Sequence, residues 1–122
     1  MYKEITLKRS NGEEKVYKFL SSGATAYRYR QVFHEDLMLQ LKHMSVFESG
    51  KSDDNNADST VLDKLAFIMN AQAEGKNIKT LNFDSFVDWA EELESGELLR
   101  VLGEILNLYL GSKVSQITAK KD

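Results

Sequence analysis

Few side chains of this chain have the chemistry of a reaction centre. It has no cysteine and two histidines, His34 and His43, nine residues apart. On one helix this spacing would point the two imidazoles to opposite sides, so they could not share a metal ion. Glu35 and Asp36 follow His34, but adjacent residues of a helix diverge in direction. Because a site needs several converging groups, we expect neither a metal ion nor catalysis at His34.

A second group of titratable side chains lies toward the C-terminus and comprises Asp84, Asp88, Glu91, Glu92 and Glu94. Paired carboxylates can serve as general acid and base when their surroundings shift their pKa values. Here they fall on the polar face of an expected helix, which favours a solvent-facing role. The chain also lacks a phosphate-binding glycine loop, a nucleophile elbow and a His-Glu-x-x-His zinc motif. We therefore expect a protein that is not an enzyme and holds no metal or cofactor.

The composition indicates one small domain. The chain has 122 residues, of which 42% are hydrophobic, enough for one core without metal or disulfide support. No apolar run reaches the ~18 residues of a membrane span, and the first residues lack the apolar core of a secretory signal. We expect a cytoplasmic protein with no membrane partner, and the lack of cysteine fits that compartment.

The net charge of −3 is unevenly distributed along the chain. Residues 1–44 have eight Lys or Arg against five Asp or Glu, whereas residues 81–98 have six acidic side chains and no basic one. Duplex binding needs a clustered basic surface, and the basic residues here are scattered, so nucleic acid is not an expected partner. The acidic stretch could attract a basic partner, but a solvated helix face is the favoured interpretation.

The first twenty residues predict a β-hairpin. Residues 2–9 alternate in character, Asn11-Gly12 signals a tight turn because both residues tolerate positive φ, and residues 15–20 form the returning strand. Two strands alone are marginal in water, so one face of the hairpin should lie on the helices.

Helices are expected after the hairpin. The first spans residues 25–44 as either the spine of the domain or a binding surface, with an apolar face of Tyr29, Phe33, Leu37, Leu41 and Met44. A polar loop at residues 45–58 is expected to be mobile, and Asp58 or Ser59 then caps a helix at residues 60–74. Gly75 ends that helix in a left-handed cap.

A third helix begins at Asn82 and is interrupted at Ser95-Gly96, and the last and most apolar helix spans residues 97–110 until Gly111-Ser112 stops it. The fold class is therefore α+β and predominantly helical, with an N-terminal β-hairpin packed on a bundle of about four α-helices. Residues 1–112 form this single hairpin-plus-helices domain, including the mobile loop, and residues 113–122 form a flexible polar tail.

The aromatic residues allow two interpretations each. Tyr27, Tyr29 and Phe33, with arginines between them, could stack bases of a single strand, but such platforms accompany a basic groove. Core packing is therefore favoured for Tyr29 and Phe33. Trp89 fits a core anchor and an interface contact equally well.

The order of the elements and two motifs resemble a known family. The motifs are Tyr29-Arg-Gln-Val-Phe-His-Glu-Asp-Leu37 and the acidic Phe83-Asp-Ser-Phe-Val-Asp-Trp-Ala-Glu-Glu-Leu93, which a Leu-rich helix follows. Over residues 1–112 the chain resembles the tail assembly chaperones of long-tailed (siphovirus-type) phages and prophages. Members of that family often have Gly after the Phe of the first motif, where this chain has His34.

The resemblance implies a non-enzymatic assembly factor that works in the host cytoplasm and is not part of the mature virion. Such chaperones bind the tape measure protein, a long and largely helical chain, keep it soluble and help recruit major tail tube subunits. A groove between helices suits a helical partner, and the candidate partner-binding residues are Tyr27, Arg30, His34, Trp89, Leu99, Leu106 and Tyr109. The family commonly makes a longer frameshift product, with which Ala119-Lys120-Lys121 is compatible.

Two alternatives stay open. A small phage or bacterial nucleic-acid-binding regulator would need a basic helix-turn-helix, which these helices do not supply, and retention on heparin would distinguish it. An enzyme of unfamiliar type is the other, and it would need a concave pocket with converging polar groups. Self-association of a chaperone is also expected to be possible, because the wide apolar surface of the last helix is either buried on several sides or completed by a second chain.

Overall fold

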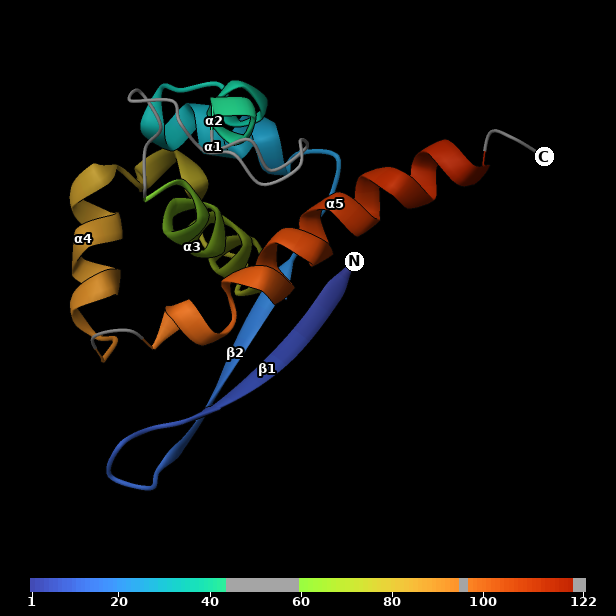
Figure 1. The fold of residues 1–122 in the computed structure, drawn as a ribbon. Helices are drawn as coiled ribbons and strands as arrows, with labels where there is room; N and C mark the ends of the chain where they lie inside the picture. The colour runs from blue at the N-terminus through green and yellow to red at the C-terminus, as the bar shows by residue number, and fades with distance from the viewer. Residues whose placement is uncertain (44–59, 95–96, 120–122) are drawn as a thin grey trace.

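A β-hairpin is followed by helices in the computed structural model, which describes residues 1–43, 60–94 and 97–119 (Figure 1). The described elements are β1 Tyr2–Lys8, β2 Glu14–Leu20, α1 Thr25–Phe33, α2 Leu37–His43, α3 Val61–Ala73, the 3-10 turn η1 Ile78–Thr80, α4 Phe83–Glu91, the 3-10 turn η2 Leu98–Arg100 and α5 Leu102–Ala119. The expected α+β, predominantly helical class is confirmed. The expected loop at residues 45–58 and its capping residues Asp58 and Ser59 lie outside the described residues.

The hairpin pairs β1 and β2 antiparallel, from Tyr2 opposite Leu20 to Lys8 opposite Glu14. One face lies on the helices as expected, and its buried side chains are Ile5, Leu7, Tyr17 and Phe19. The turn is longer than the tight form that Asn11-Gly12 suggested. The Arg9 N–H donates to the Glu13 carbonyl (2.7 Å), which closes a three-residue loop in which Gly12 alone has a positive φ, 89°.

Helix α3 is the centre of the fold (Figure 1) and contacts β2, α1, α2, α4 and α5. Its buried residues lie on every side of the helix rather than on one stripe, including Leu65, Phe67, Ile68 and Met69. A helix that is apolar all round belongs in a core. The role of spine, one of the two expected for residues 25–44, therefore belongs to α3, which Gly75 (φ 69°) follows in the predicted left-handed conformation.

The single helix predicted for residues 25–44 is wrong, because the chain breaks into α1 and α2. His34 takes the left-handed conformation (φ 58°, ψ 32°), and its N–H donates to the Arg30 carbonyl. Asp36 then caps α2 by accepting from the Leu39 N–H at 3.1 Å. The two helices still direct the expected apolar residues Tyr29, Leu37 and Leu41 into the core, where all three are buried. Met44 lies outside the described residues.

Buried Lys64 connects the turn between α1 and α2 to the central helix α3. Lys64 of α3 places its Nζ 3.3 Å from the Glu35 Oε1 and 5.3 Å from the centre of the Phe33 ring. The same carboxylate oxygen accepts from the Tyr29 hydroxyl at 3.1 Å. A buried ammonium needs a charged partner, and Glu35 supplies it. Through its contacts with Tyr29 and Lys64, Glu35 connects the turn to both α1 and α3.

Helix α4 begins as the sequence predicts, since Asn82 and Ser85 form a reciprocal capping box. The last helix differs from prediction at both ends. Residues 98–100 form η2 before α5 begins, and α5 continues through Gly111 to Ala119, so the predicted stop at Gly111-Ser112 is wrong. Gly111 does not take a positive φ, and a glycine inside a helix costs only about 1 kcal/mol, which does not by itself end the helix.

Candidate functional site

Two of the predicted partner-binding residues share the solvent-facing side of α1, and a third ends the helix. Tyr27 and Arg30 lie at i and i+3 on one face of α1, whereas His34 is its left-handed C-cap; all three are exposed. The Tyr27 side chain is 72% exposed, whereas Tyr29 on the opposite side is buried. The structure therefore brings Tyr27 and Arg30 together and places His34 at the end of the same helix.

Two of them line a groove between α1 and α2 with a volume of about 340 Å³. Tyr27, Met38 and Leu37 supply apolar surface, and Arg30 and Asp36 add one positive and one negative charge. The groove exists because α1 and α2 are separate helices, so the left-handed His34 and the cap at Asp36 shape it. Its chemistry suits an apolar side chain of a partner with polar groups on either flank.

The other four candidates divide between core and surface. Tyr109 is buried, and its hydroxyl donates to the Met38 sulfur at 3.6 Å, so it packs the core beneath the groove. Trp89 is 9% exposed with its ring centre 5.5 Å from that of Phe67, which makes it a core anchor. Leu106 is partly buried against the core, whereas Leu99 in η2 is 73% exposed.

A buried network around Glu97 fastens the hairpin to the chain before η2. Glu97 is 4% exposed and accepts from the Arg9 Nε (3.0 Å), the Tyr17 hydroxyl (3.1 Å) and the Glu94 N–H (3.0 Å). Arg9 also donates to the Glu92 carbonyl, and Ser10 donates to the Glu94 carboxylate through both its N–H and its hydroxyl. The contacts of Arg9, Ser10 and Tyr17 with this segment join residues 80 to 88 positions apart.

The network changes the titration of its members. Burial alone would raise the pKa of Glu97, but the hydrogen bonds from the Glu94 N–H, Arg9 and Tyr17 outweigh it and hold that pKa below its ordinary value. Burial, opposed by Arg9, raises the pKa of the Tyr17 hydroxyl. A carboxylate that stays ionised inside the protein is a structural fastening here, since its lone pairs already accept from protein donors.

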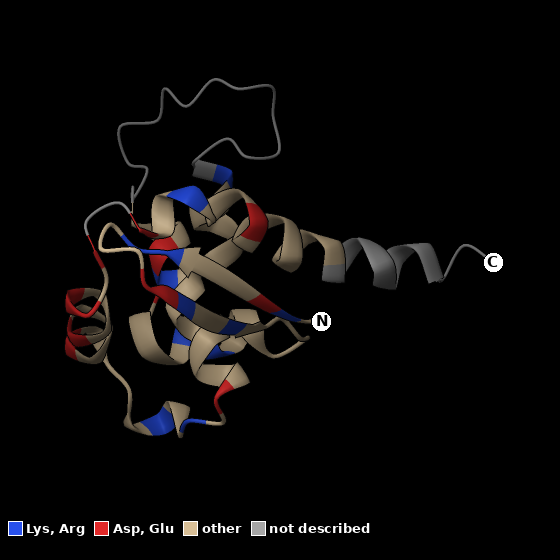
Figure 2. Cartoon of the chain, turned by 90° about the horizontal axis from the view of Figure 1, so that it is seen from below, with Lys and Arg blue, Asp and Glu red and all other residues tan. Residues whose placement is uncertain are grey.

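Four other carboxylates of the acidic stretch face solvent: Asp84, Asp88, Glu91 and Glu92. Figure 2 shows the acidic residues gathered on α4, at the left of the view. Within the described part of the chain, none of these four side chains forms an ion pair. The expectation of a solvated acidic face is confirmed for these residues, and it is wrong for Glu94, which Ser10 binds.

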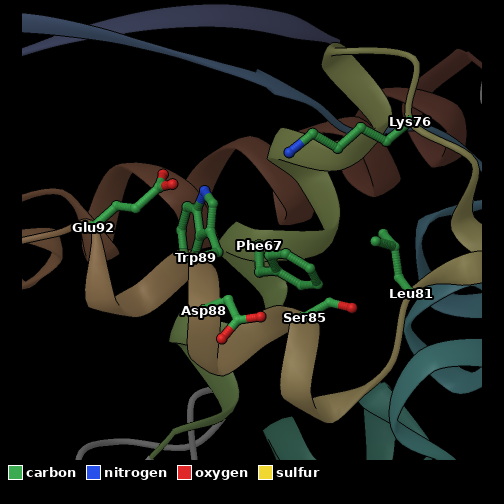
Figure 3. A pocket seen from close by; sticks show the side chains of 7 residues that line it. All are labelled: Phe67, Lys76, Leu81, Ser85, Asp88, Trp89 and Glu92. Carbon is green, nitrogen blue, oxygen red and sulfur yellow. The ribbon is translucent and has the colours of Figure 1, made fainter.

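Grooves flank α4 on both sides. On one side, a pocket of about 240 Å³ is lined by the rings of Phe67 and Trp89, with Lys76 reaching over from the turn after α3 (Figure 3). Asp88 and Glu92 reach the same pocket from α4 and its C-cap (Figure 3). On the other side, a groove of about 370 Å³ is lined by Phe86, Val87, Ala90, Glu91 and Leu93.

Sequence reasoning missed the Glu97 network and the role of Met38. Arg9, Tyr17 and Glu97 carry no local signal that pairs them, because their contact depends on how the hairpin packs. Met38 becomes part of the groove because the chain breaks before α2, and the capping residue Asp36 is the signal that could have revealed this.

Comparisons with known proteins add no family or fold relative: no protein-family model, curated protein or solved structure matches the chain. Among residues 1–42, 60–94 and 97–111, whose side chains the structure describes, no three His, Asp or Glu side chains group in a way that could hold a metal ion. No helix in the described part of the chain is long and apolar enough to cross a membrane. Grooves beside α1 and α4 are candidate binding surfaces.

Proposed function

We propose that this protein is a tail assembly chaperone of a long-tailed phage or prophage. In this role it binds the tape measure protein in the host cytoplasm, keeps it soluble and helps to recruit tail tube subunits. The order of a hairpin followed by helices agrees with what the resemblance implies. The observation that carries the proposal is the groove between α1 and α2, whose exposed apolar residues Tyr27 and Met38 lie on either side of the Tyr29–Leu37 motif of the resemblance.

The lining of this groove suits a helical segment with an apolar face. An amphipathic helix binds through side chains at i, i+3, i+4 and i+7, which enter a groove between helices of the partner. Met38 adapts its shape to different apolar side chains, and the Tyr27 ring gives a large contact area with little loss of conformational entropy. Arg30 and Asp36 can pair with polar residues at the edges of such a helix.

Co-expression with a fragment of the tape measure protein tests the proposal. We expect the chain to raise the soluble yield of the fragment, and Tyr27→Ser to bring the yield back toward the level without chaperone. Tyr2→Ser is the matched control, because Tyr2 is also exposed but lies on the hairpin, away from the groove. An unchanged yield with the wild-type chain would count against the chaperone role, and equal loss in both variants would count against the groove.

Gene order gives an independent test of the same proposal. We expect a tail tube gene upstream and a very long tape measure gene downstream, with a slippery heptamer at the codons for Ala119-Lys120-Lys121 and an overlapping downstream frame. An unrelated operon would contradict the proposal, whereas codons that cannot slip would remove the frameshift product alone.

A further inference from the structure

The exposed side of α4 combines an apolar strip with a line of carboxylates. Phe83, Val87 and Ala90 recur at i, i+4 and i+7, and we call them the outer strip of α4. Phe83 is 52% exposed and Val87 39% exposed, whereas Phe86 and Trp89 face the core. The acidic line is Asp84, Asp88 and Glu91, which recurs at the same spacing one residue further along the chain. The two rows therefore run side by side along the helix.

The outer strip borders a groove. Val87 and Ala90 line the 370 Å³ groove with Phe86 and Leu93, and Glu91 of the acidic line reaches its edge. Positions 83, 86, 87, 90 and 93 have the spacing of a helix–helix seam, in which side chains of one helix fit between those of another. Phe86 of this seam packs in the core, whereas Phe83 and Val87 of the outer strip are open to solvent.

The charge beside the strip restricts what can occupy it. The acidic line lacks an ion-pair partner within the described part of the chain, and the stretch 81–98 contains no Lys or Arg. Like charges at i and i+4 repel one another along a helix, and a row of cations on an occupant would remove that repulsion. A nucleic acid or an acidic helix would increase it, so charge complementarity favours a basic occupant.

We infer that α4 is a docking site for a basic amphipathic helix of another protein. The apolar face of that helix lies on Phe83, Val87 and Ala90, and its Lys or Arg residues lie against Asp84, Asp88 and Glu91. The inference rests on α4 alone and not on the proposed function, since the α1–α2 groove belongs to other elements. Without a partner, the exposed surface of α4 combines two unfavourable features, namely apolar side chains in contact with water and like charges that repel one another. A basic amphipathic helix would relieve both.

Titration with synthetic peptides tests the inference directly. The probe is an amphipathic helical peptide of Leu and Lys, and its control has the same Leu positions with Glu in place of Lys. A fluorescein label on each peptide reports binding through its anisotropy, because Trp89, the one tryptophan of the chain, faces the core and not the outer strip. We expect the Lys peptide to bind and the Glu peptide not to bind.

Charge variants locate the site. Neutralising the acidic line in the variant Asp84→Asn, Asp88→Asn, Glu91→Gln should raise the Kd about tenfold, as three partly exposed ion pairs are lost. The matched control changes three exposed carboxylates elsewhere and has the same net charge: Glu13→Gln, Glu14→Gln, Glu104→Gln. Val87→Ser, which leaves the charge unchanged, should also weaken binding. Equal weakening by both charge variants would show unspecific attraction and overturn the inference.

Two further outcomes would also overturn it. Equal affinity for the Lys and Glu peptides would mean that the strip binds apolar surface without regard to charge. A lower mass of the acidic-line variant than of the wild-type chain in light scattering, with no peptide present, would mean that a second copy of this chain covers α4. The tape measure experiment uses neither peptide, so failure of the proposed function would not imitate either result.

Discussion

Glu97 and Asp88 belong to the same acidic stretch, yet their surroundings are opposite. Glu97 is buried and accepts from Arg9, Tyr17 and the Glu94 N–H, whereas Asp88 faces solvent and has no ion-pair partner within the described residues. Burying a carboxylate is unfavourable unless hydrogen-bond donors satisfy its lone pairs, and the donors that converge on Glu97 do so. The comparison separates carboxylates that hold the fold from carboxylates that remain available to a partner.

The two groups also differ in the chain segments that they join. The Glu97 network connects the hairpin to the segment before η2, and it therefore depends on the complete fold. The acidic line belongs to one helix and would form wherever α4 forms. A substitution in the first group should change stability, and one in the second should change binding with little effect on stability.

The largest expected effect comes from Glu97→Gln, which breaks the fastening of the hairpin. The amide cannot accept from all the donors around Glu97, and the free energy of unfolding should fall by about 2–3 kcal/mol. Urea denaturation measures this change. Glu91→Gln is the same exchange in the acidic line and should change stability by less than about 0.5 kcal/mol. Equal losses in the two variants would abolish the distinction between the groups.

The pH dependence of stability should follow Glu97 as well. Its pKa is lower in the folded state than in the unfolded state, so the unfolded chain binds the proton more readily. The contribution of Glu97 is complete above the unfolded carboxyl pKa of about 4.3, and it is lost as the pH falls through the lower folded pKa. Denaturation at a series of pH values should show the wild-type chain and Glu97→Gln converging on the acid side. A constant difference between them would show that the ionised carboxylate is not the stabilising form.

His34→Gly should raise stability without touching either group of carboxylates. His34 has φ 58°, a conformation that side chains with a Cβ disfavour, and glycine there should raise the free energy of unfolding by about 0.5–1 kcal/mol. His34→Ala keeps the Cβ and should give no such gain. The affinity of α4 for the Lys peptide should be the same in all three proteins, so a parallel change in affinity would mean that binding follows overall stability.

His34 also shows which features of the fold can be predicted from neighbouring residues in the sequence. The hairpin, the capping box at Asn82 and the end of α3 at Gly75 were predictable, because neighbouring residues determine them. The break at His34 was harder to predict, because apolar periodicity continues through it from Tyr29 to Leu41 and the capping residue Asp36 is its one local signal. A glycine at this position would fit the left-handed conformation that the structure shows.

The candidate sites were predictable in part, for a similar reason. The exposed side of α1 follows from its spacing, so Tyr27 and Arg30 could be named from the sequence. The opposite surroundings of Glu97 and Asp88 could not, because they depend on where the hairpin packs, and Arg9 is 88 positions away from Glu97. Periodicity identifies an apolar stripe on α4, but only the packing leaves Phe83 and Val87 exposed while Phe86 and Trp89 are buried.

The smallest expected effect is also the most specific one. Asp88 lies one turn from Asp84 and three residues from Glu91, so Asp88→Asn removes like-charge repulsion and should stabilise the chain by about 0.2–0.5 kcal/mol. Asp84→Asn should instead cost a few tenths of a kcal/mol, since Asp84 lies in the first turn, where a negative charge favours the helix. Both substitutions should weaken binding of the Lys peptide, which the anisotropy of the labelled peptide would report beside the urea curves. A residue whose removal improves the fold and impairs binding is a residue kept for a partner, whereas a loss of stability in Asp88→Asn would place Asp88 with Glu97 among the carboxylates that hold the fold.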